Sequence, residues 1–198
     1  MGAFQDYLDL RMAVAEMVGR NDISDVMPRM VKLAESYLNR ELRIRDMETP
    51  AVLTFANGVA PLPADYLEMK YVFGGDGTPM QGTTARVVAY DRNAQNGYSI
   101  ENDGVHIYSL NGVTRNCIYY ASLPTLTASP TTSNWLLQDA ENLYLYAVSY
   151  EVAKWMKDVD LASKLAGLRD LEMVELKRMD NKARFGNAVI RPVGALNP

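Results

Sequence analysis

Few residues of this 198-residue chain have the chemistry that catalysis or metal binding requires. His106 is its single histidine and Cys117 its single cysteine. A zinc site with two imidazoles, a thiolate cluster and a disulfide within the chain are therefore all excluded. His106 alternates within a strand-like run and Cys117 stands beside Ile118. We interpret both as strand residues, not as the base and nucleophile of a catalytic site.

Acidic residues close in sequence offer the one enzymatic alternative, because paired carboxylates cleave glycosidic bonds. Three such pairs are Asp46 with Glu48, Glu101 with Asp103, and Asp139 with Glu141. Each pair lies near a predicted turn or helix end, where acidic residues are common for capping and solvation. We expect no enzymatic activity. A cell-wall hydrolase that uses Glu101 and Asp103 stays open as the alternative.

The remaining composition excludes further classes of protein. Gly74-Gly75-Asp76-Gly77 lacks the Lys-Ser/Thr that follows a phosphate loop, and we expect no cofactor and no metal. The net charge of −4 argues against DNA binding over the whole surface. No apolar run approaches the roughly 18 residues of a membrane span, and the start of the chain lacks a signal-peptide pattern. We expect an intracellular protein that contacts no membrane.

Residues 133–158 predict the central element of the fold. Ser133-Asn134 is suited to capping a helix. From Leu143 to Met156, apolar and aromatic residues occupy nearly every side of that helix. A helix that is apolar all round is normally enclosed by other elements or by partner chains.

Further helices are predicted on both sides of this element. Apolar residues at helical spacing predict helices over 3–18 and 25–42, with Gly19 ending the first and Pro28 in the first turn of the second. An amphipathic helix is expected over 161–184. Its apolar face is expected from Leu165, Leu168, Leu171 or Glu172, Val174 with Glu175, and Met179.

Residues 49–123 have a strand pattern instead. Short β-branched runs alternate with turn residues, and Asn57-Gly58 predicts a hairpin. We expect Tyr66–Phe73 to hold a turn of helix that runs into a strand. A β-meander is expected from strands at 98–101, 105–108 and 117–120.

Together these elements predict an α+β fold, in which an antiparallel helical bundle carries an inserted β-rich subdomain and an extended C-terminal tail. The expected segments are a helical pair at 1–48, the β-rich insertion at 49–123, long helices at 124–185 and the tail at 186–198. The tail holds prolines and a glycine, yet it is rather apolar, which is typical of a segment that docks on another surface. Its apolar residues include Ile190, Val193 and Leu196.

Three segments have a distinctive pattern. They are Leu62-Pro63-Ala64-Asp65-Tyr66-Leu67-Glu68-Met69, then Ile118-Tyr119-Tyr120-Ala121-Ser122-Leu123-Pro124-Thr125-Leu126, and Asn134-Trp135-Leu136-Leu137 with Leu143-Tyr144-Leu145-Tyr146-Ala147. In order and separation they resemble the "LP-x-DYLE", "Y-Y-x-x-[IL]-P-x-L" and "NWLL…LYLYGAL" segments of the head-to-tail connector, or adaptor, proteins of tailed bacteriophages. Val148-Ser149-Tyr150 departs from the family, where small residues are usual, and the chain after Phe185 matches no family pattern.

The resemblance implies a structural virion protein, made in the host cytoplasm, that forms a twelvefold ring below the portal. The ring would join the portal to tail or nozzle proteins, and DNA would pass through it without sequence-specific binding. The tail would dock on the portal. A monomeric recruitment or scaffolding protein is the second alternative. The candidate interface residues are Trp135, Tyr144, Tyr146, Ile190, Val193 and Leu196.

Overall fold

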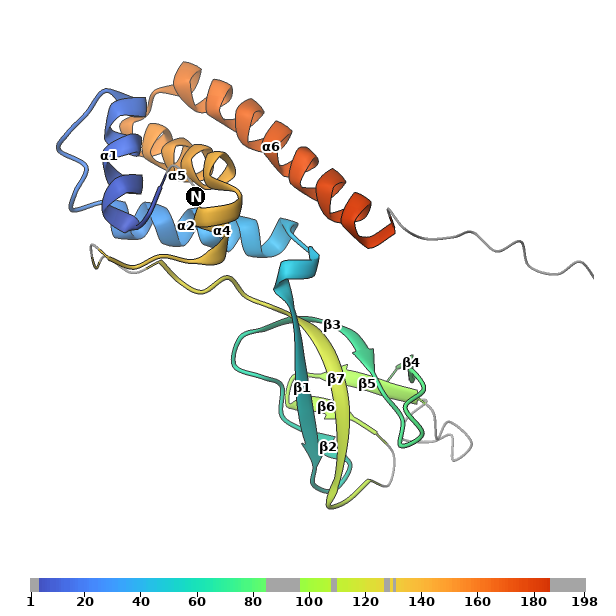
Figure 1. Ribbon diagram of the computed structural model, residues 1–198. Coiled ribbons are helices and arrows are strands. Elements are labelled where there is room, and N and C mark those ends of the chain that lie inside the picture. Colours follow the sequence, from blue (N-terminus) through green and yellow to red (C-terminus); the bar gives the residue numbers. More distant parts are fainter. Residues whose placement is uncertain (1–3, 85–96, 108–109, 127–128, 130, 186–198) are drawn as a thin grey trace, which may run out of the picture. The chain divides into compact units, whose positions relative to one another are not determined.

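Helices and strands segregate into two units of the chain (Figure 1). The computed structural model describes residues 4–84, 97–107, 110–126, 129 and 131–185. The helical unit combines residues 1–45 with 123–198, and the β unit spans 46–122. The predicted α+β class is confirmed. The predicted tail at 186–198 lies outside the described residues.

The helical unit is built from helices that begin and end at recognisable signals. The Asp6 carboxylate accepts hydrogen bonds from the N–H groups of Leu8 and Asp9 and so caps the first helix. Gly19 ends that helix and Pro28 lies in the first turn of the second, both as predicted. The helices are α1 (Tyr7–Val18), α2 (Met27–Glu41), α4 (Trp135–Asp139), α5 (Glu141–Met156) and α6 (Val159–Phe185), and a short 3-10 turn, η1 (Arg45–Met47), leads into the β unit.

The central helix is α5, against which α1, α2, α4 and α6 all pack. Its buried side chains lie on most sides of the helix, so the helical unit encloses much of this segment, but Tyr146 and Tyr150 are only half-buried and Trp155 is 40% exposed. The prediction of a single helix over 133–158 is wrong, because Ala140, with φ −139° and ψ 53°, separates α4 from α5. The buried apolar residues of α5 are Leu143, Tyr144, Leu145, Ala147, Val148, Val152 and Ala153.

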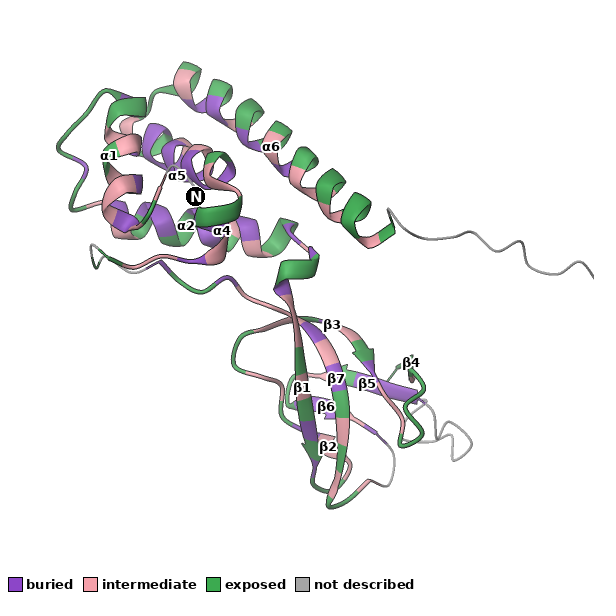
Figure 2. Cartoon of the chain, viewed as in Figure 1, coloured by how far each residue is buried: buried purple, intermediate pink, exposed green. Residues whose placement is uncertain are grey.

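A different face of α6 from the predicted one packs on α5. The buried residues of α6 are Ala162, Leu165, Arg169 and Met173. Of the apolar residues predicted for the packing face, only Leu165 is buried, and the others are exposed on the sides of the helix that turn away from α5 (Figure 2). The exposed residues are Leu168 (41%), Leu171 (69%), Val174 (65%) and Met179 (57%).

Arg169 explains this choice of face. Its guanidinium carbon lies 4.1 Å from the centre of the Tyr37 ring and 4.7 Å from that of Tyr150. The cation therefore links α6 to α2 and α5 through two aromatic faces. Asp170 accepts a hydrogen bond from Arg169 Nε at 2.9 Å. A charged residue thus occupies the position where a periodicity argument expects an apolar one.

Two sheets surround the core of the β unit. One has the order β1-β7-β3 and is antiparallel, and the other has the order β2-β6-β5-β4 with a parallel β4–β5 pair. Leu53, Phe55, Val72, Val105 and Cys117 are among the residues buried in this core. The strands are β1 (Glu48–Phe55), β2 (Val59–Ala60), β3 (Tyr66–Val72), β4 (Gln81–Gly82), β5 (Gly97–Glu101), β6 (Gly104–His106) and β7 (Val113–Ala121).

The strand predictions have mixed outcomes. The Asn57-Gly58 turn is confirmed, because Ala56 and Val59 exchange backbone hydrogen bonds of 2.9 and 3.1 Å around two residues with positive φ. The helical turn predicted within Tyr66–Phe73 is wrong, since Tyr66–Val72 is strand β3 throughout. The meander forms only in part: β5 pairs with β6, but β7, nine residues long, lies between β1 and β3 in the other sheet.

Gly104 provides a test of this sheet packing. Its φ is +149°, and a Cβ there would lie 2.1 Å from the carbonyl oxygen of Ala60 on the paired strand. We expect Gly104→Ala to lower the free energy of unfolding by about 2 kcal/mol or more, because backbone atoms would have to move. Urea unfolding monitored by circular dichroism measures the change.

The matched control is Gly82→Ala in the same sheet. A Cβ at Gly82 would meet the Tyr98 ring at 3.6 Å, an ordinary contact. We expect a change within about 0.5 kcal/mol there. Equal effects of the two substitutions would contradict the described packing of β6 against β2.

Candidate assembly site

A buried carboxylate, Glu35 of α2, joins two of the distinctive sequence segments. Glu35 is 5% exposed. Its Oε1 accepts hydrogen bonds from the Leu126 N–H at 2.7 Å and from the Tyr144 hydroxyl at 2.6 Å. Leu126 ends the second segment and Tyr144 belongs to the third. A carboxylate can stay in a core only when donors of this kind satisfy it.

Two asparagines hold the same stretch of chain, where it returns to the helical unit. Asn39 Oδ1 accepts a hydrogen bond from the Leu123 N–H at 2.9 Å. Asn134 Nδ2 donates to the Pro124 carbonyl at 2.9 Å, while its Oδ1 accepts from the Leu137 N–H and caps α4, as predicted. Residues 123–126 form no helix or strand, so their backbone groups need side-chain partners. We call Glu35, Asn39, Asn134 and Tyr144 the polar clamp.

The chain passes from one unit to the other at a second position, and there too a side chain holds its backbone. Where the chain leaves the helical unit, the Arg45 N–H donates to Asp180 Oδ1 of α6 at 3.0 Å. Asp180 Oδ2 in turn accepts from Arg184 Nε at 2.7 Å. Side chains of the helical unit therefore fix the backbone at both ends of the inserted strands.

The first and second segments meet inside the β unit. The Tyr119 hydroxyl donates to Asp65 Oδ1 at 2.8 Å, and the Tyr119 and Tyr66 rings stack with centres 6.1 Å apart. Burial, together with the bond to Asp65, raises the pKa of Tyr119 to about 12. Tyr119 therefore acts as a neutral hydrogen-bond donor at physiological pH.

The candidate interface residues differ in their exposure. Tyr144 is fully buried and its hydroxyl belongs to the polar clamp, so it offers no surface for direct contact. Trp135 and Tyr146 are partly exposed. The interface role of the set stays a prediction. Ile190, Val193 and Leu196 lie outside the described residues.

Two residues with notable contacts in the structure, Glu35 and Trp155, were not identified from the sequence. Glu35 lies three residues before Leu38 and four after Val31, and therefore on the apolar side of α2. A carboxylate on the apolar side of a helix was the signal in the sequence that this residue has a special role. Trp155, in the last turn of α5, is 40% exposed, and the Arg20 guanidinium carbon lies 5.5 Å from its ring centre.

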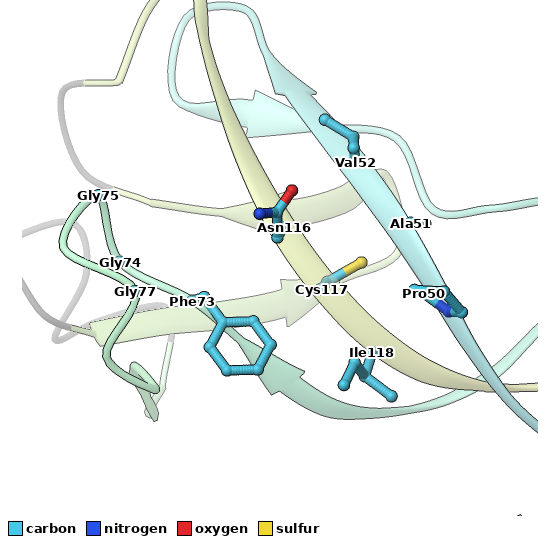
Figure 3. Close-up of a pocket in the computed structure, with 10 residues that line it drawn as sticks. All are labelled: Pro50, Ala51, Val52, Phe73, Gly74, Gly75, Gly77, Asn116, Cys117 and Ile118. Atoms are coloured by element: carbon cyan, nitrogen blue, oxygen red, sulfur yellow. The ribbon is translucent and has the colours of Figure 1, made fainter.

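A groove of about 590 Å³ lies in the β unit against β1 and β7 (Figure 3). Cys117 borders it, but burial raises the pKa of that thiol, which is the opposite of what an activated nucleophile needs. The lining is mainly apolar and suits an apolar side chain better than a reaction. It includes Pro50, Val52, Phe73, Asn116 and Ile118.

Two of the candidate acidic pairs each have a member that is engaged in another interaction. Asp103 Oδ1 lies 2.7 Å from His106 Nε2, and this hydrogen bond lowers the pKa of the Asp103 carboxyl, whereas a general acid needs a raised one. Glu48 pairs with Lys70 at 2.6 Å. Among the described residues, no group of three acidic, histidine or cysteine side chains is arranged to hold a metal ion. No helix within the described ranges is long and apolar enough to span a membrane.

The polar clamp makes stability depend on pH. Burial raises the pKa of the Glu35 carboxyl above its ordinary value of 4.5, although the bonds from Leu126 and Tyr144 act in the opposite direction. A raised pKa in the folded state means that Glu35 adds stability below about pH 4.5, and that this contribution is lost as the pH rises through the folded pKa.

We therefore expect the free energy of unfolding of the wild type, relative to Glu35→Gln, to fall as the pH rises from 4.5 towards 7. The fall is at most about 1.4 kcal/mol for each pH unit between the two pKa values. Urea unfolding at a series of pH values measures it. Glu41→Gln, which changes an exposed carboxylate at the end of the same helix, should keep the wild-type profile. A difference between wild type and Glu35→Gln that does not vary with pH would overturn the prediction.

Comparison with known protein families identifies a family for this chain. A family model described as "SU10 adaptor protein" matches residues 5–192. The matched range includes the whole β unit, the described helices of the helical unit and all three distinctive segments, and the resemblance to phage adaptor proteins is confirmed. No curated protein matches the chain.

Proposed function

The chain belongs to the SU10 adaptor protein family, and we propose that it is a structural head-to-tail connector of a tailed-phage virion. Copies of the chain form a ring below the portal and join the portal to tail or nozzle proteins. DNA passes through the lumen, and the protein is not an enzyme. The observation that carries this proposal is the family match over residues 5–192.

Exposed apolar side chains on the helical unit support a role in assembly. Trp155, Leu171, Val174 and Phe185 are 40%, 69%, 65% and 67% exposed. Extended apolar surface on a folded domain is typical of a site that binds another protein. In a ring, each subunit covers part of its neighbour's surface, so such residues become buried on assembly.

The charge of the chain fits a lumen that DNA only traverses. The formal net charge is −4. A protein that holds DNA does so by neutralising phosphates with many lysine and arginine side chains, and binding of that kind would retard a moving duplex. A ring of acidic subunits therefore favours sliding of the DNA over retention.

The C-terminal tail is proposed as the portal-binding segment. Ile190, Val193 and Leu196 are spaced three residues apart between prolines and glycines. A short extended segment of this composition binds by inserting apolar side chains into a partner's groove. In this proposal the portal supplies the groove.

The ring proposal is tested by mixing the purified protein with the portal protein of the same phage and imaging the product by negative-stain electron microscopy. We expect an added ring below the portal, with the twelvefold symmetry that the resemblance implies. Portal particles that gain no added density at any concentration of the protein would refute the proposal.

The role of the tail is tested by replacing Ile190, Val193 and Leu196 together with Asp. We expect portal binding, measured by co-sedimentation, to weaken at least about tenfold, since apolar anchors dominate such contacts. The matched control places Asp at Asn187, Ala195 and Asn197, which also adds three negative charges to the tail. Equal loss of binding in both variants would show that charge, not apolar docking, is responsible.

A further inference from the structure

The exposed side of α2 carries cations and no carboxylate. Four exposed polar residues of this helix fall within about 80° of one another around its axis, because a helix turns once every 3.6 residues. We call them the basic stripe: Arg29, Lys32, Ser36 and Arg40 (exposed positions are green in Figure 2). The two carboxylates of α2 lie elsewhere, since Glu35 is buried and Glu41 lies about 100° beyond the edge of the stripe.

The cations of the basic stripe have no partner within the part of the chain that the structure describes. No hydrogen bond or ion pair there holds the side chain of Arg29, Lys32 or Arg40. Asp25, just before the helix, does not pair with Arg29, and Lys32 acts on the buried Glu35 only through its charge. Several other cations of the helical unit do pair with carboxylates. Because neighbouring cations on a helix repel each other, the stripe does not stabilise α2 and points to a partner outside the chain.

The stripe presents the hydrogen-bond donors that a phosphate backbone accepts. Arginine, lysine and serine side chains are among those that commonly contact DNA phosphates. From Arg29 to Arg40 the stripe extends over about 17 Å of the helix axis. A DNA duplex presents one charge for about every 1.7 Å, and therefore about ten phosphates over that length. A phosphate is thus within reach of each donor in any register, as a moving duplex requires.

The distribution of apolar residues favours DNA over a protein as the partner. Leu33 is 47% exposed, but it lies at the edge of the stripe, and cations and a serine occupy the middle. A protein interface has the reverse arrangement, with an apolar centre that is depleted of charge and a polar rim. Interfaces with DNA are more polar and much more positively charged.

We propose that the basic stripe of α2 binds the phosphate backbone of duplex DNA. In the proposed connector, on which this step rests, α2 then faces the lumen through which the DNA passes. The contacts carry no sequence information, and electrostatic contacts of this kind let a protein slide along DNA. Three cations in each chain guide the duplex, while the net charge of −4 prevents the rest of the surface from holding it.

Binding to a short fluorescein-labelled DNA duplex tests the stripe in the full chain. Fluorescence anisotropy is measured at a series of low salt concentrations. Each phosphate contact contributes roughly −0.9 to the slope of log K against log salt concentration, so three cations predict a slope of about −2.7. Duplexes rich in A·T and in G·C should bind with equal affinity, because the stripe contacts only phosphates.

The variant Arg29→Gln/Lys32→Gln/Arg40→Gln removes the three cations and keeps residues that favour a helix. We expect its affinity for the duplex at the lowest salt concentration to fall at least about tenfold, and the salt slope to approach zero. Circular dichroism verifies that the helices are retained.

The matched control is Lys157→Gln/Lys164→Gln/Lys182→Gln. These three lysines are exposed and likewise have no ion pair among the described residues, but they form no stripe, since Lys164 and Lys182 are about 27 Å apart along α6. The control shifts the net charge from −4 to −7, as the stripe variant does. It should keep the wild-type salt slope.

Three outcomes would overturn the proposal. Equal loss of affinity in the two variants would mean that scattered charge, not the stripe, attracts DNA. A wild-type chain that does not bind the duplex even at the lowest salt concentration would exclude a phosphate-binding surface. Poly-glutamate is the comparison probe: tighter binding of poly-glutamate than of the duplex, lost in the stripe variant, would assign the stripe to an acidic protein.

Imaging with the portal protein separates this inference from the proposed function. The stripe variant should still add a ring to the portal, and a loss of the ring in this variant alone would assign the stripe to a contact between proteins. A wild-type ring without DNA binding would refute the stripe and leave the connector function standing. DNA binding without a ring would do the reverse. In a map of the DNA-filled vertex, α2 should be the helix nearest the duplex, and a lumen lined by other helices would contradict its placement.

Discussion

The fold of the helical unit depends on hydrogen bonds to one buried carboxylate. Glu35 accepts from the backbone of Leu126 and from the hydroxyl of Tyr144, and so a single side chain of α2 fixes both the returning chain and the central helix. Without such partners, a backbone that re-enters a core outside regular structure would bury unsatisfied polar groups. These hydrogen bonds add to the apolar burial that positions α5 and the helices packed on it.

Around this centre the helical unit has more apolar surface than it can cover. Arg169 takes an inward position on α6 between two tyrosine rings, which turns Leu171 and Val174 outward. In a single copy of the chain, only one of the two apolar sides of such a helix is buried, and the other stays in contact with water. Arg169, which stands where an apolar residue is expected, therefore determines which face of α6 packs on α5. It also determines which apolar side chains stay exposed for assembly.

Local signals in the sequence were sufficient for some features and insufficient for others. Gly19, the Asn57-Gly58 turn and the Asn134 cap were predicted correctly, because each depends on a few neighbouring residues. The β5–β6 pair of the predicted meander forms, but the place of its third strand was wrong, since nothing local to β7 shows that it pairs with β1 and β3. Tyr144 was chosen as an interface residue because buried cores and interfaces both favour tyrosine, and sequence does not separate them. Only the Glu35 contacts reveal which environment it occupies.

The chain passes between its two units at two positions, and side chains of a single unit hold the backbone at both. Asp180 holds the backbone at Arg45 and Asn39 holds it at Leu123, so both anchors belong to the helical unit. Neither anchor uses an atom of residues 46–122. We therefore expect changes of sequence within residues 46–122 to leave both of these anchoring hydrogen bonds in place.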